Sequence, residues 1–503
     1  MKPSLYLVIP RPPFNDMRVF PNSGLPVARM FADLTMVTVA SLAPPDIEIS
    51  ICDEELGQVD FDTAASVVGL TCRMGNEWRV VELANHFRRR GKKVVVGGPG
   101  AESGHDMLRP YCDTLVIGEL EGVAGEFFGD LAAGQLKREY RGPKPDLSTS
   151  PAPRWDLLNH DRTVSATIQT SRGCPFVCEF CDVPVTLGRI QRFKSSEQVI
   201  SELQTLYDIG YRAVSIVDDN LTVNRRRAKA LLSDIAAWNH SRPDGAVLFS
   251  ALVSLDAARD KELLDCCARA GVVFVFVGIE SPNPESLREA KKRQNLLGNI
   301  SSQIDVILSH GIMVTGGLIV GFDSDERDVF DQQLEFSAQM PVPIFTASIL
   351  SPLVGTPLFT RMQAEGRLVT VLDVTRNYAS PLHPQIVPKN MTHQELVAGH
   401  ARLVNGLFAP ESFSHRLASF VKRFKSSPLS PRFSAPEQLR PVERQALYEL
   451  VDSYLEMAPA LRWWRNEKPD ATLERLFRLS VFQYLRLIAP RRRTAAASAQ
   501  AYA

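Results

Sequence analysis

The chain has 503 residues, and its 57 basic and 57 acidic side chains cancel to a formal net charge of zero at neutral pH. A chain of this length exceeds what one compact core can bury, so it predicts two or three domains. Because the charges balance, the protein as a whole has no net electrostatic attraction to nucleic acid or to a bulk membrane surface. We therefore expect a small-molecule partner and no nucleic acid.

The cysteine content and the apolar segments indicate the compartment. Eight Cys in 503 residues, with Cys266 and Cys267 adjacent, is the sparse usage of a reducing compartment and not of a disulfide framework. The apolar run from Leu5 to Ile9 is short and ends at Pro10, which favours a strand over a signal peptide. Since no window reaches the roughly 20 apolar residues of a membrane span, we expect a cytoplasmic protein.

Residues 1–135 alternate short β-rich runs with amphipathic segments, the pattern of a doubly wound parallel sheet. The expected strands are 5–9, 47–52, 67–71, 93–96 and 114–117. Ligands of such sheets bind beyond the carboxyl ends of the strands, and three of those ends are unusual. They read Thr71-Cys72-Arg73-Met74-Gly75-Asn76, Gly97-Gly98-Pro99-Gly100 and Gly118-Glu119-Leu120-Glu121-Gly122. Taken alone, these glycines also fit plain turns.

A Pro-, Ser- and charge-rich stretch at 136–165 predicts a linker. The alternation of strands and helices then resumes, with strands expected at 166–170, 213–217, 247–252, 272–277, 313–319 and 345–350. Catalytic groups of barrels built this way gather at the carboxyl ends of the strands, where this chain carries its polar residues. Residues from 388 onward predict helices and no strands.

Three cysteines with the spacing C-x-x-x-C-x-x-C follow the first strand of this second region, namely Cys174, Cys178 and Cys181. Three thiolates so close in sequence can hold one corner of a [4Fe–4S] cluster and leave its fourth iron open to a small molecule. A structural zinc site is the alternative, but it needs a fourth ligand, and no His stands at a finger-like spacing. The three thiols therefore predict an iron–sulfur site.

This stretch resembles the signature of the radical S-adenosylmethionine (SAM) enzymes, which carry the triplet after the first strand of a partial barrel, with an aromatic residue, here Phe180, before the third Cys. The N-terminal region resembles the cobalamin-binding domain that one large subgroup carries ahead of its barrel. The resemblance implies an α/β fold with a Rossmann-like cobalamin-binding domain at 1–135, a partial (β/α)6 barrel at 166–387 and an α-helical domain at 388–503. It implies a [4Fe–4S] cluster, S-adenosylmethionine and cobalamin as cofactors.

The resemblance also assigns residues to these cofactors. Contacts to S-adenosylmethionine are expected beside the cluster and at the ends of the second, fourth and fifth barrel strands: Phe180, Asp218, Asp219, Asn220, Glu280, Ser281, Gly317 and Gly321. Contacts to cobalamin are expected at the three strand ends of the first domain: Thr71, Cys72, Arg73, Met74, Gly97, Gly98, Gly118 and Glu119. The chain departs from the family where Asp218-Asp219-Asn220 replaces Gly-Gly-Glu and where Asp323 replaces a Glu.

A histidine ligand to cobalt is not expected. Methionine-synthase-like cobalamin proteins supply one from a D-x-H-x-x-G string, and no such string occurs in residues 1–150. His86 and His105 lie outside any such context and are interpreted as ordinary surface or core histidines. We expect the lower face of cobalamin to be covered by the loop at Arg73 and Met74.

The C-terminal segment 411–503 is basic, with 16 Lys and Arg against 9 Asp and Glu. It contains Trp463-Trp464 and a stretch at 473–488 rich in Arg, Leu and aromatic residues. A basic amphipathic helix of this kind can lie in a lipid interface, which predicts peripheral contact with the inner face of a membrane. A helix packed on the barrel with solvated arginines is the alternative interpretation.

Together these features predict a cobalamin-dependent radical SAM methyltransferase that acts on an unactivated carbon of a small molecule or lipid, with hopanoids as one candidate class. The alternatives are an oxidase or cyclase of the same architecture, which transfers no methyl group, and a non-catalytic iron–sulfur or cobalamin sensor. The resemblance also implies an electron donor such as flavodoxin or ferredoxin. No catalytic side chain is assigned, because the cofactors carry the chemistry.

Overall fold

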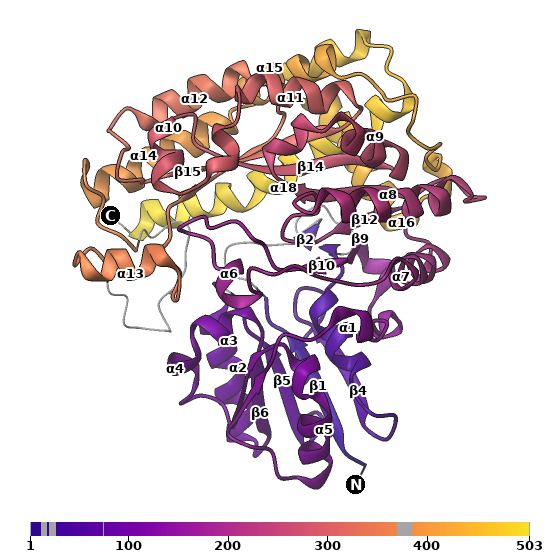
Figure 1. Cartoon of the computed structure of the whole chain (residues 1–503), viewed down its shortest axis with the longest axis vertical. Helices are drawn as coiled ribbons and strands as arrows, with labels where there is room; N and C mark the ends of the chain where they lie inside the picture. Colours follow the sequence, from indigo (N-terminus) through magenta and orange to yellow (C-terminus); the bar gives the residue numbers. More distant parts are fainter. Residues whose placement is uncertain (1, 12–17, 20–26, 74, 370–384, 502–503) are drawn as a thin grey trace. The chain divides into compact units, whose positions relative to one another are not determined.

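The computed structural model describes residues 2–11, 18–19, 27–73, 75–369 and 385–501 (Figure 1). The chain divides into two compact units. Unit 1 comprises Met1–Pro175, Phe180–Leu206 and Ser351–Gln385, and unit 2 comprises Phe176–Glu179, Tyr207–Leu350 and Ile386–Ala503.

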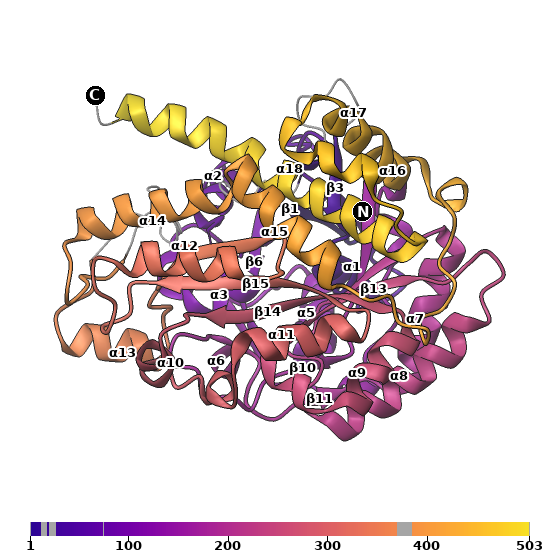
Figure 2. The same cartoon turned by 90° about the horizontal axis from the view of Figure 1, so that it is seen from above.

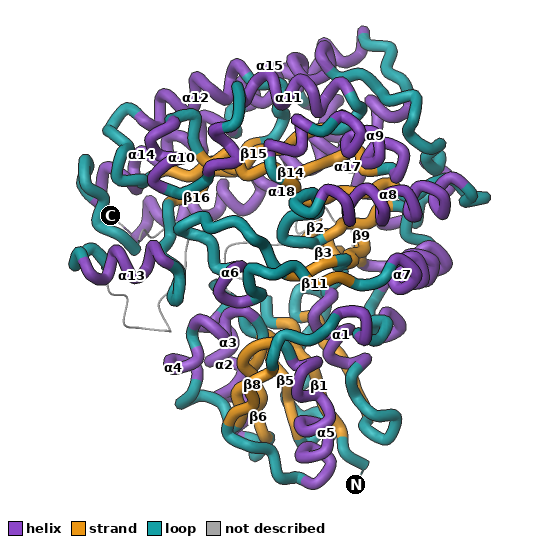
Figure 3. The backbone as a smooth tube through the Cα atoms, viewed as in Figure 1, coloured by secondary structure: helices purple, strands orange, loops and turns teal. Residues whose placement is uncertain are grey.

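Unit 1 contains a sheet of six parallel strands in the order β4-β1-β5-β6-β7-β8. Its strands, among them β1, β5, β6 and β8, are drawn in orange in Figure 3. The strands are β1 (Ser4–Ile9), β4 (Glu48–Asp53), β5 (Val67–Thr71), β6 (Lys93–Gly97), β7 (Thr114–Gly118) and β8 (Glu139–Gly142). The first five agree with the expected strands to within one residue at either end, because runs of Val, Ile and Leu mark them. Since all are parallel, their carboxyl ends lie at one edge of the sheet.

Helices cover both faces of this sheet. On one face α2 (Glu77–Arg89), α3 (Pro99–Ser103) and α4 (His105–Leu108) complete a core through Val80, Leu83, Ala84, Phe87, Ala101 and Leu108. On the other face α1 (Leu34–Ser41) and α5 (Ala124–Ala133) contribute Met36, Ala40, Phe127, Phe128 and Leu131. This layering is the doubly wound arrangement that the sequence predicts.

A smaller group of strands in unit 1 leads to the cysteine loop. β3 (Ala28–Phe31) pairs in parallel with β9 (Thr163–Ile168) and antiparallel with β2 (Arg18–Val19). β9 overlaps the first expected barrel strand, 166–170, but begins three residues earlier, within the stretch predicted to be a linker. The short strands β10 (Ser171–Arg172) and β11 (Arg192–Phe193) pair antiparallel beyond it. The unit also holds α6 (Val183–Thr186), most of α7 (Ser196–Ile209) and α13 (Pro357–Ala364).

The strand β8 lies within the stretch 136–165 that the sequence predicts to be a linker. It places the ring of Tyr140 in the core, 2% exposed, and the Tyr140 hydroxyl donates to the carboxylate of Asp130 at 2.7 Å. Tyr140 is the only buried residue of this edge strand. Because so short an edge strand shows no apolar alternation, sequence periodicity does not reveal it. These four residues are strand and not linker.

Unit 2 contains five parallel strands in the order β12-β13-β14-β15-β16. They are β12 (Ala213–Ile216), β13 (Leu248–Val253), β14 (Val272–Glu280), β15 (Met313–Val320) and β16 (Phe345–Ile349), and each begins within one residue of the expected position. The helices between them are α8 (Arg225–His240), α9 (Lys261–Ala270), α10 (Pro284–Glu289), α11 (Ile300–Ser309) and α12 (Val329–Gln339). The domain boundaries at 135, 166 and 388 stay predictions.

The C-terminal helices of unit 2 are α14 (His393–Leu407), α15 (Pro410–Arg423), α16 (Pro441–Arg444), α17 (Leu450–Met457) and α18 (Ala471–Ala501). α18 lies against α15 and α17 (Figure 2). Its Phe477 ring stacks on Trp464 with centroids 3.6 Å apart, and its Tyr484 ring stacks on Phe413 at 4.1 Å. The aromatic side chains expected to enter a lipid interface therefore pack against protein, as in the alternative interpretation. Among the described residues, no helix combines the length and the apolar character needed to cross a membrane.

Candidate functional site

The cysteine loop begins at β10, and its first residue, Gly173, approaches the returning arm closely. The φ angle of Gly173 is +98°, a conformation that L side chains rarely adopt. A Cβ at this position would lie 2.8 Å from the carbonyl oxygen of Ile190 and 2.9 Å from that of Gly188. The N–H of Cys174 donates to the same Gly188 carbonyl at 3.1 Å. The outgoing and returning arms of the loop are thus so close that only glycine fits at 173.

The middle cysteine of the triplet, Cys178, belongs to the short segment that clusters with unit 2. Its Sγ lies 3.6 Å from Nε2 of Gln294, and Gln294 is itself only 6% exposed. The neighbouring Glu179 N–H donates to the carbonyl of Ala290 at 3.0 Å. An amide donor beside a cluster thiolate stabilises its negative charge and tunes the reduction potential of the cluster. Gln294 is therefore a site residue that the cysteine motif does not reveal.

The donor set, three thiols within eight residues, is of the kind that binds a [4Fe–4S] cluster. In the part of the chain that the structure describes, no three His, Cys, Asp or Glu side chains are grouped so that one ion could be held. Thiolates on a [4Fe–4S] cluster bind different irons, so the three cysteines need not converge on one point. Burial raises the pKa of the Cys72, Cys112 and Cys267 thiols, which favours their neutral form as packing groups.

Two of the three polar residues after β12 are buried. Asp218 is 1% and Asn220 6% exposed, whereas Asp219 is half-buried. Nδ2 of Asn220 donates to Oγ of Ser254 at 3.1 Å, and its Oδ1 accepts from the N–H of Thr222 at 3.1 Å. Asn220 therefore forms a turn that fixes the Asp218-Asp219 segment. Contact of these residues with S-adenosylmethionine stays a prediction.

Glu280 ends β14 with a strained backbone. Its φ is +66°, and only one other non-glycine residue among those described has a positive value. Such a conformation costs about 1–3 kcal/mol and persists only where the surrounding structure holds it in place, and residues of this kind cluster at active sites and ligand-binding turns. The Glu280 carboxylate pairs with the ammonium group of Lys292, and their side chains are 9% and 11% exposed. A Cβ on Gly278 would collide with both side-chain ends, so the pair folds over this glycine.

This buried pair has the two charges needed to bind an amino-acid ligand. Glu280 offers a carboxylate to an ammonium group, and Lys292 offers an ammonium group to a carboxylate. Asn295 holds the strand end by donating to the carbonyl of Gly278 at 2.9 Å. Ser281 is fully buried, and its Oγ accepts from the N–H of Asn283 at 3.1 Å, so it closes the next turn. The geometry therefore favours Glu280 over Ser281 as a ligand contact.

The glycines of β15 have packing and turn roles. A Cβ on Gly317 would lie 2.8 Å from Cζ of Phe276. Gly321, just after the strand, has a φ of +103°, and its N–H donates to Oδ2 of Asp325 at 2.8 Å. Burial raises the pKa of Asp325 to about 6, although hydrogen bonds from two backbone N–H groups and one serine oppose the rise. A role of Gly317 or Gly321 toward adenine stays a prediction.

The loops after β5 and β6 pack together through glycine. Gly98 has a φ of +96°, and a Cβ there would lie 2.6 Å from the carbonyl oxygen of Cys72 and 2.9 Å from Oγ1 of Thr71. The N–H of Cys72 donates to the carbonyl of Gly97 at 2.7 Å. The Thr71 hydroxyl is buried and has no hydrogen-bond partner among the described residues. A buried hydroxyl without a protein partner is expected where a ligand supplies the missing hydrogen bond. Thr71 therefore fits the expected cobalamin contact.

Arg73 is anchored at this strand end by Asp33. Its guanidinium group pairs with the Asp33 carboxylate, which is fully buried, while the Arg73 side chain stays 41% exposed. Burial alone would raise the pKa of Asp33, but the guanidinium groups of Arg73 and Arg29 outweigh it and lower that pKa. Arg73 is thus a fixed group with an exposed face, suited to cover a flat ligand. Met74 lies outside the described residues.

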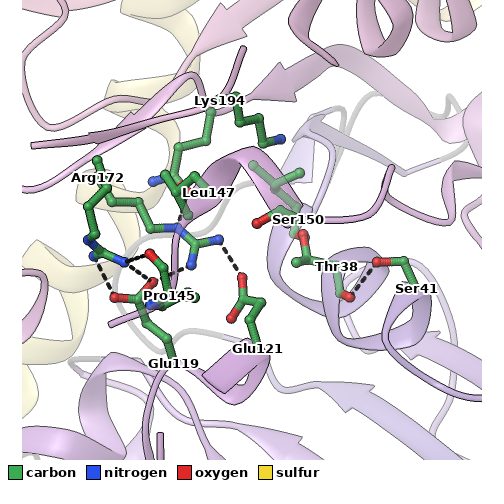
Figure 4. A network of polar contacts seen from close by, with 12 residues as sticks. Thr38, Ser41, Glu119, Glu121, Pro145, Leu147, Ser150, Arg172 and Lys194 are labelled. Carbon is green, nitrogen blue, oxygen red and sulfur yellow. Dashed lines mark hydrogen bonds and ion pairs between the residues drawn. The ribbon is translucent and has the colours of Figure 1, made fainter. Parts of the chain in front are cut away.

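The loop after β7 is held close to β8. Gly118 has a φ of +79°, and a Cβ there would lie 2.5 Å from the carbonyl oxygen of Gly142. The next residue, Glu119, turns its carboxylate to the arms of the cysteine loop (Figure 4). It accepts from Arg172 at 2.5 Å and from Arg192 at 2.6 and 2.9 Å. Both carboxylate oxygens of Glu119 are therefore engaged within the protein.

Comparison with known proteins now identifies the family. A model of the radical SAM superfamily matches residues 168–335, which include all three cysteines of the loop. The chain belongs to the radical SAM superfamily. A second model, Domain of unknown function (DUF4070), matches residues 356–458.

Relatives and solved structures extend this likeness beyond the matched segment. The radical SAM chain is 36% identical over 346 residues to an uncharacterized methyltransferase of Synechocystis sp., covering 67% of this chain and 63% of that one. It is 30% identical over 354 residues to the hopanoid C-2 methylase of Rhodopseudomonas palustris, covering 68% and 66%. The chain thus spans just under two thirds of the length of these relatives.

The solved structure of the radical SAM methyltransferase TsrM from Kitasatospora setae, with cobalamin and a [4Fe-4S] cluster bound, has a TM-score of 0.62 at 16% identity. The match covers 85% of this chain and 97% of that one. At this identity the likeness shows the fold. The predictions of family and fold class, a Rossmann-like domain with a partial barrel and a helical C-terminal part, are confirmed.

Sequence reasoning missed four side chains that support these loops, Arg172, Arg192, Lys292 and Gln294. Arg172 stands two residues before Cys174, so its position in the motif was a usable signal. Arg192 and Gln294 lie far along the chain from their partners Glu119 and Cys178. Lys292 lies in a polar stretch that would also suit a solvated surface. No spacing rule connects any of the three with its partner.

Proposed function

We propose that this chain is a cobalamin-dependent methyltransferase of the radical SAM superfamily, acting on an unactivated carbon of a small-molecule or lipid substrate. The observation that carries the proposal is the three-cysteine loop, whose two arms approach so closely that only glycine fits at 173. The methyltransferase names of the relatives support methyl transfer as the reaction. When bound, the cluster with S-adenosylmethionine would supply a radical that removes a hydrogen atom, and cobalamin would supply the methyl group that replaces it.

The chain's own residues would bind and orient these groups. Cys174, Cys178 and Cys181 would hold three irons of the cluster, and Gln294 would donate to the thiolate of Cys178. The Glu280–Lys292 pair and the Asp218-Asp219 segment would bind the amino-acid part of S-adenosylmethionine. Phe180, which is half-buried beside Cys181, would cover the cluster from solvent.

Cobalamin would lie at the carboxyl edge of the six-stranded sheet. There Thr71 offers a buried hydroxyl without a hydrogen-bond partner among the described residues, and Arg73 offers an anchored guanidinium group. Gly97, Gly98 and Gly118 have no side chains, so the ligand could approach the backbone closely. No D-x-H-x-x-G string is present in residues 1–150. We therefore propose cobalt without a protein histidine, which paramagnetic resonance of cob(II)alamin tests through the absence of nitrogen splitting.

Methyl-labelled S-adenosylmethionine tests the reaction. The reduced, cobalamin-loaded protein is incubated with cell extract, and products are analysed by mass spectrometry. A labelled methyl group in a product together with 5′-deoxyadenosine supports the methyltransferase. Production of 5′-deoxyadenosine with an unlabelled, oxidised or cyclised product would favour the oxidase or cyclase, and the absence of both would favour the sensor.

The substrate class and the partners are the finer part of the proposal. The hopanoid name of one relative supports a polycyclic lipid as substrate. Peripheral membrane contact has only the basic residues of the tail as support, because Trp464, Phe477 and Tyr484 pack against protein. We further propose an electron donor such as flavodoxin or ferredoxin, and reduction of the loaded cluster by each purified carrier tests it.

A further inference from the structure

Two carboxylates and two guanidinium groups join the loop after β7 to the arms of the cysteine loop, all within unit 1. We propose that Glu119, Glu121, Arg172 and Arg192, here called the carboxylate clasp, are positioning residues that hold these arms in the geometry the cluster requires. Glu119 then supports the cluster through the arginines instead of contacting cobalamin through its carboxylate. The inference rests on the proposed function for the identity of the cluster.

The contacts of the carboxylate clasp are specific. Arg192 binds both oxygens of Glu119, with Nη2 to Oε1 at 2.6 Å and Nη1 to Oε2 at 2.9 Å. Arg172 places Nη1 2.5 Å from Oε2 of Glu119 and Nη2 2.8 Å from Oε1 of Glu121 (Figure 4). A two-pronged contact between Arg and a carboxylate fixes orientation as well as distance. Glu119 therefore fixes both guanidinium groups at once.

The two arginines lie on the two arms of the cysteine loop, one on each. Arg172 and Arg192 are directly opposite each other in the antiparallel pair β10–β11, one on each arm. Arg192 also donates to the carbonyl of Leu187, at 3.1 Å, and to that of Pro145, at 3.0 Å. Arg172 precedes Cys174 by two residues. A shift of either arginine would therefore move an arm that leads directly to a cluster ligand.

Burial makes the carboxylate clasp sensitive to the loss of any member. The side chains of Glu119, Glu121, Arg172 and Arg192 are 8%, 11%, 13% and 15% exposed. Their four charges balance in the arrangement as it stands. Removing one carboxylate leaves a buried guanidinium group without its partner, which is strongly disfavoured. We expect the arms to rearrange in response.

Cluster retention by the full-length chain tests the proposal. Wild type and Glu119→Gln are reconstituted anaerobically, and release of iron to a chelator is followed by absorbance, together with paramagnetic resonance of the reduced cluster. Loss of a residue that orients metal ligands weakens metal binding by about 10- to 100-fold, so we expect iron release from Glu119→Gln to be faster by that factor. We also expect the resonance of the reduced cluster to broaden, which a uniform loss of stability would not cause.

Glu54→Gln is the matched control. Glu54 is also in unit 1, is 7% exposed, and binds Nε of Arg79 with both oxygens, at 2.9 and 3.1 Å, without touching the cysteine loop. Its variant should lower the thermal midpoint of the apo-protein like Glu119→Gln and leave iron release and resonance unchanged. If Glu119→Gln does not fold, Arg192→Lys carries the test, because Lys keeps the charge but loses the two-pronged contact, and intermediate iron release is expected.

The outcomes separate the two proposals. A wild type that binds no cluster would overturn the proposed function. A wild type that binds the cluster, with iron release from Glu119→Gln and Arg192→Lys equal to that of Glu54→Gln, would overturn the carboxylate clasp and leave the proposed function intact.

Discussion

Glu280, with its strained backbone, and Lys292 form a buried ion pair in which each charge is compensated by the other. Replacing Glu280 by Gln leaves the Lys292 ammonium group buried without its partner, and we expect this to destabilise the protein by about 3–5 kcal/mol. The double variant Glu280→Gln/Lys292→Met removes both charges and should recover most of that stability. We expect both variants to bind S-adenosylmethionine at least tenfold more weakly, because the groups that would recognise its amino-acid part are gone.

Urea unfolding measures the stability of the two Glu280 variants, and titration calorimetry with S-adenosylmethionine on the cluster-loaded protein measures their affinity. Wild-type affinity in the double variant would show that the Glu280–Lys292 pair is structural only.

Asp325 gives a residue-scale prediction about pH. Burial raises its pKa from 3.8 to about 6. An acid whose pKa is higher in the folded than in the unfolded state binds its proton more tightly when folded, so stability falls as pH rises from about 4 to 6 and stays reduced above. Asp325→Asn should therefore stabilise the protein by about 1–3 kcal/mol at pH 8 and abolish this pH dependence.

The Asp325→Asn side chain can keep the existing contacts, since its oxygen can accept from both backbone N–H groups and its amide can donate to Ser286. Asp331→Asn, an exposed change on the following helix, is the control. Denaturant unfolding from pH 4 to 8 provides the measurement, and an Asp325→Asn variant that is less stable at pH 8 would contradict the argument.

At the scale of elements, the cysteine loop depends on the close approach of its two arms at Gly173. An alanine at 173 would have to adopt a φ of +98° and bring its Cβ 2.8 Å from a carbonyl oxygen. Gly134→Ala is the matched control, because Gly134 also has a positive φ, +71°, but no atom lies within 4 Å of the added Cβ. We expect Gly134→Ala to cost only about 1–2 kcal/mol of stability.

Gly173→Ala should instead prevent loading of the iron–sulfur cluster, because the two arms must separate to admit the methyl group. Iron content after reconstitution and thermal unfolding of the apo-protein measure the two effects. Equal iron content in Gly173→Ala and Gly134→Ala would show that the loop tolerates the separation.

The elements also show what sequence can predict. The central strands were predictable because runs such as Val94-Val95-Val96 are buried and β-branched, and the cluster ligands because chemistry fixes their spacing. The edge strand β8 was not, since it buries only Tyr140. Gln294 and Lys292 were not either, because their roles arise from contacts that only the fold creates.

For the whole molecule, the basic tail raises the question of membrane contact. The side chains of Phe477, Phe482 and Tyr484 are at most 2% exposed, so α18 belongs to the core of unit 2. Truncation after Ala460 would remove these side chains from that core, and each buried aromatic lost this way costs about 3–5 kcal/mol. We expect the truncated chain to unfold, which makes it unsuitable for a membrane-binding test.

Liposome flotation of the full-length chain avoids that problem. Because the side chains of Phe477, Phe482 and Tyr484 are packed inside unit 2, they are not available to insert into lipid. We therefore expect the protein to stay at the bottom of the gradient with anionic vesicles at physiological salt. Any flotation at low salt should come from exposed basic side chains of the tail such as Arg462, Arg465 and Lys468, and a variant with all three replaced by Gln should weaken it. Flotation that persists at high salt would contradict the packing of α18 and restore an interfacial role for the tail.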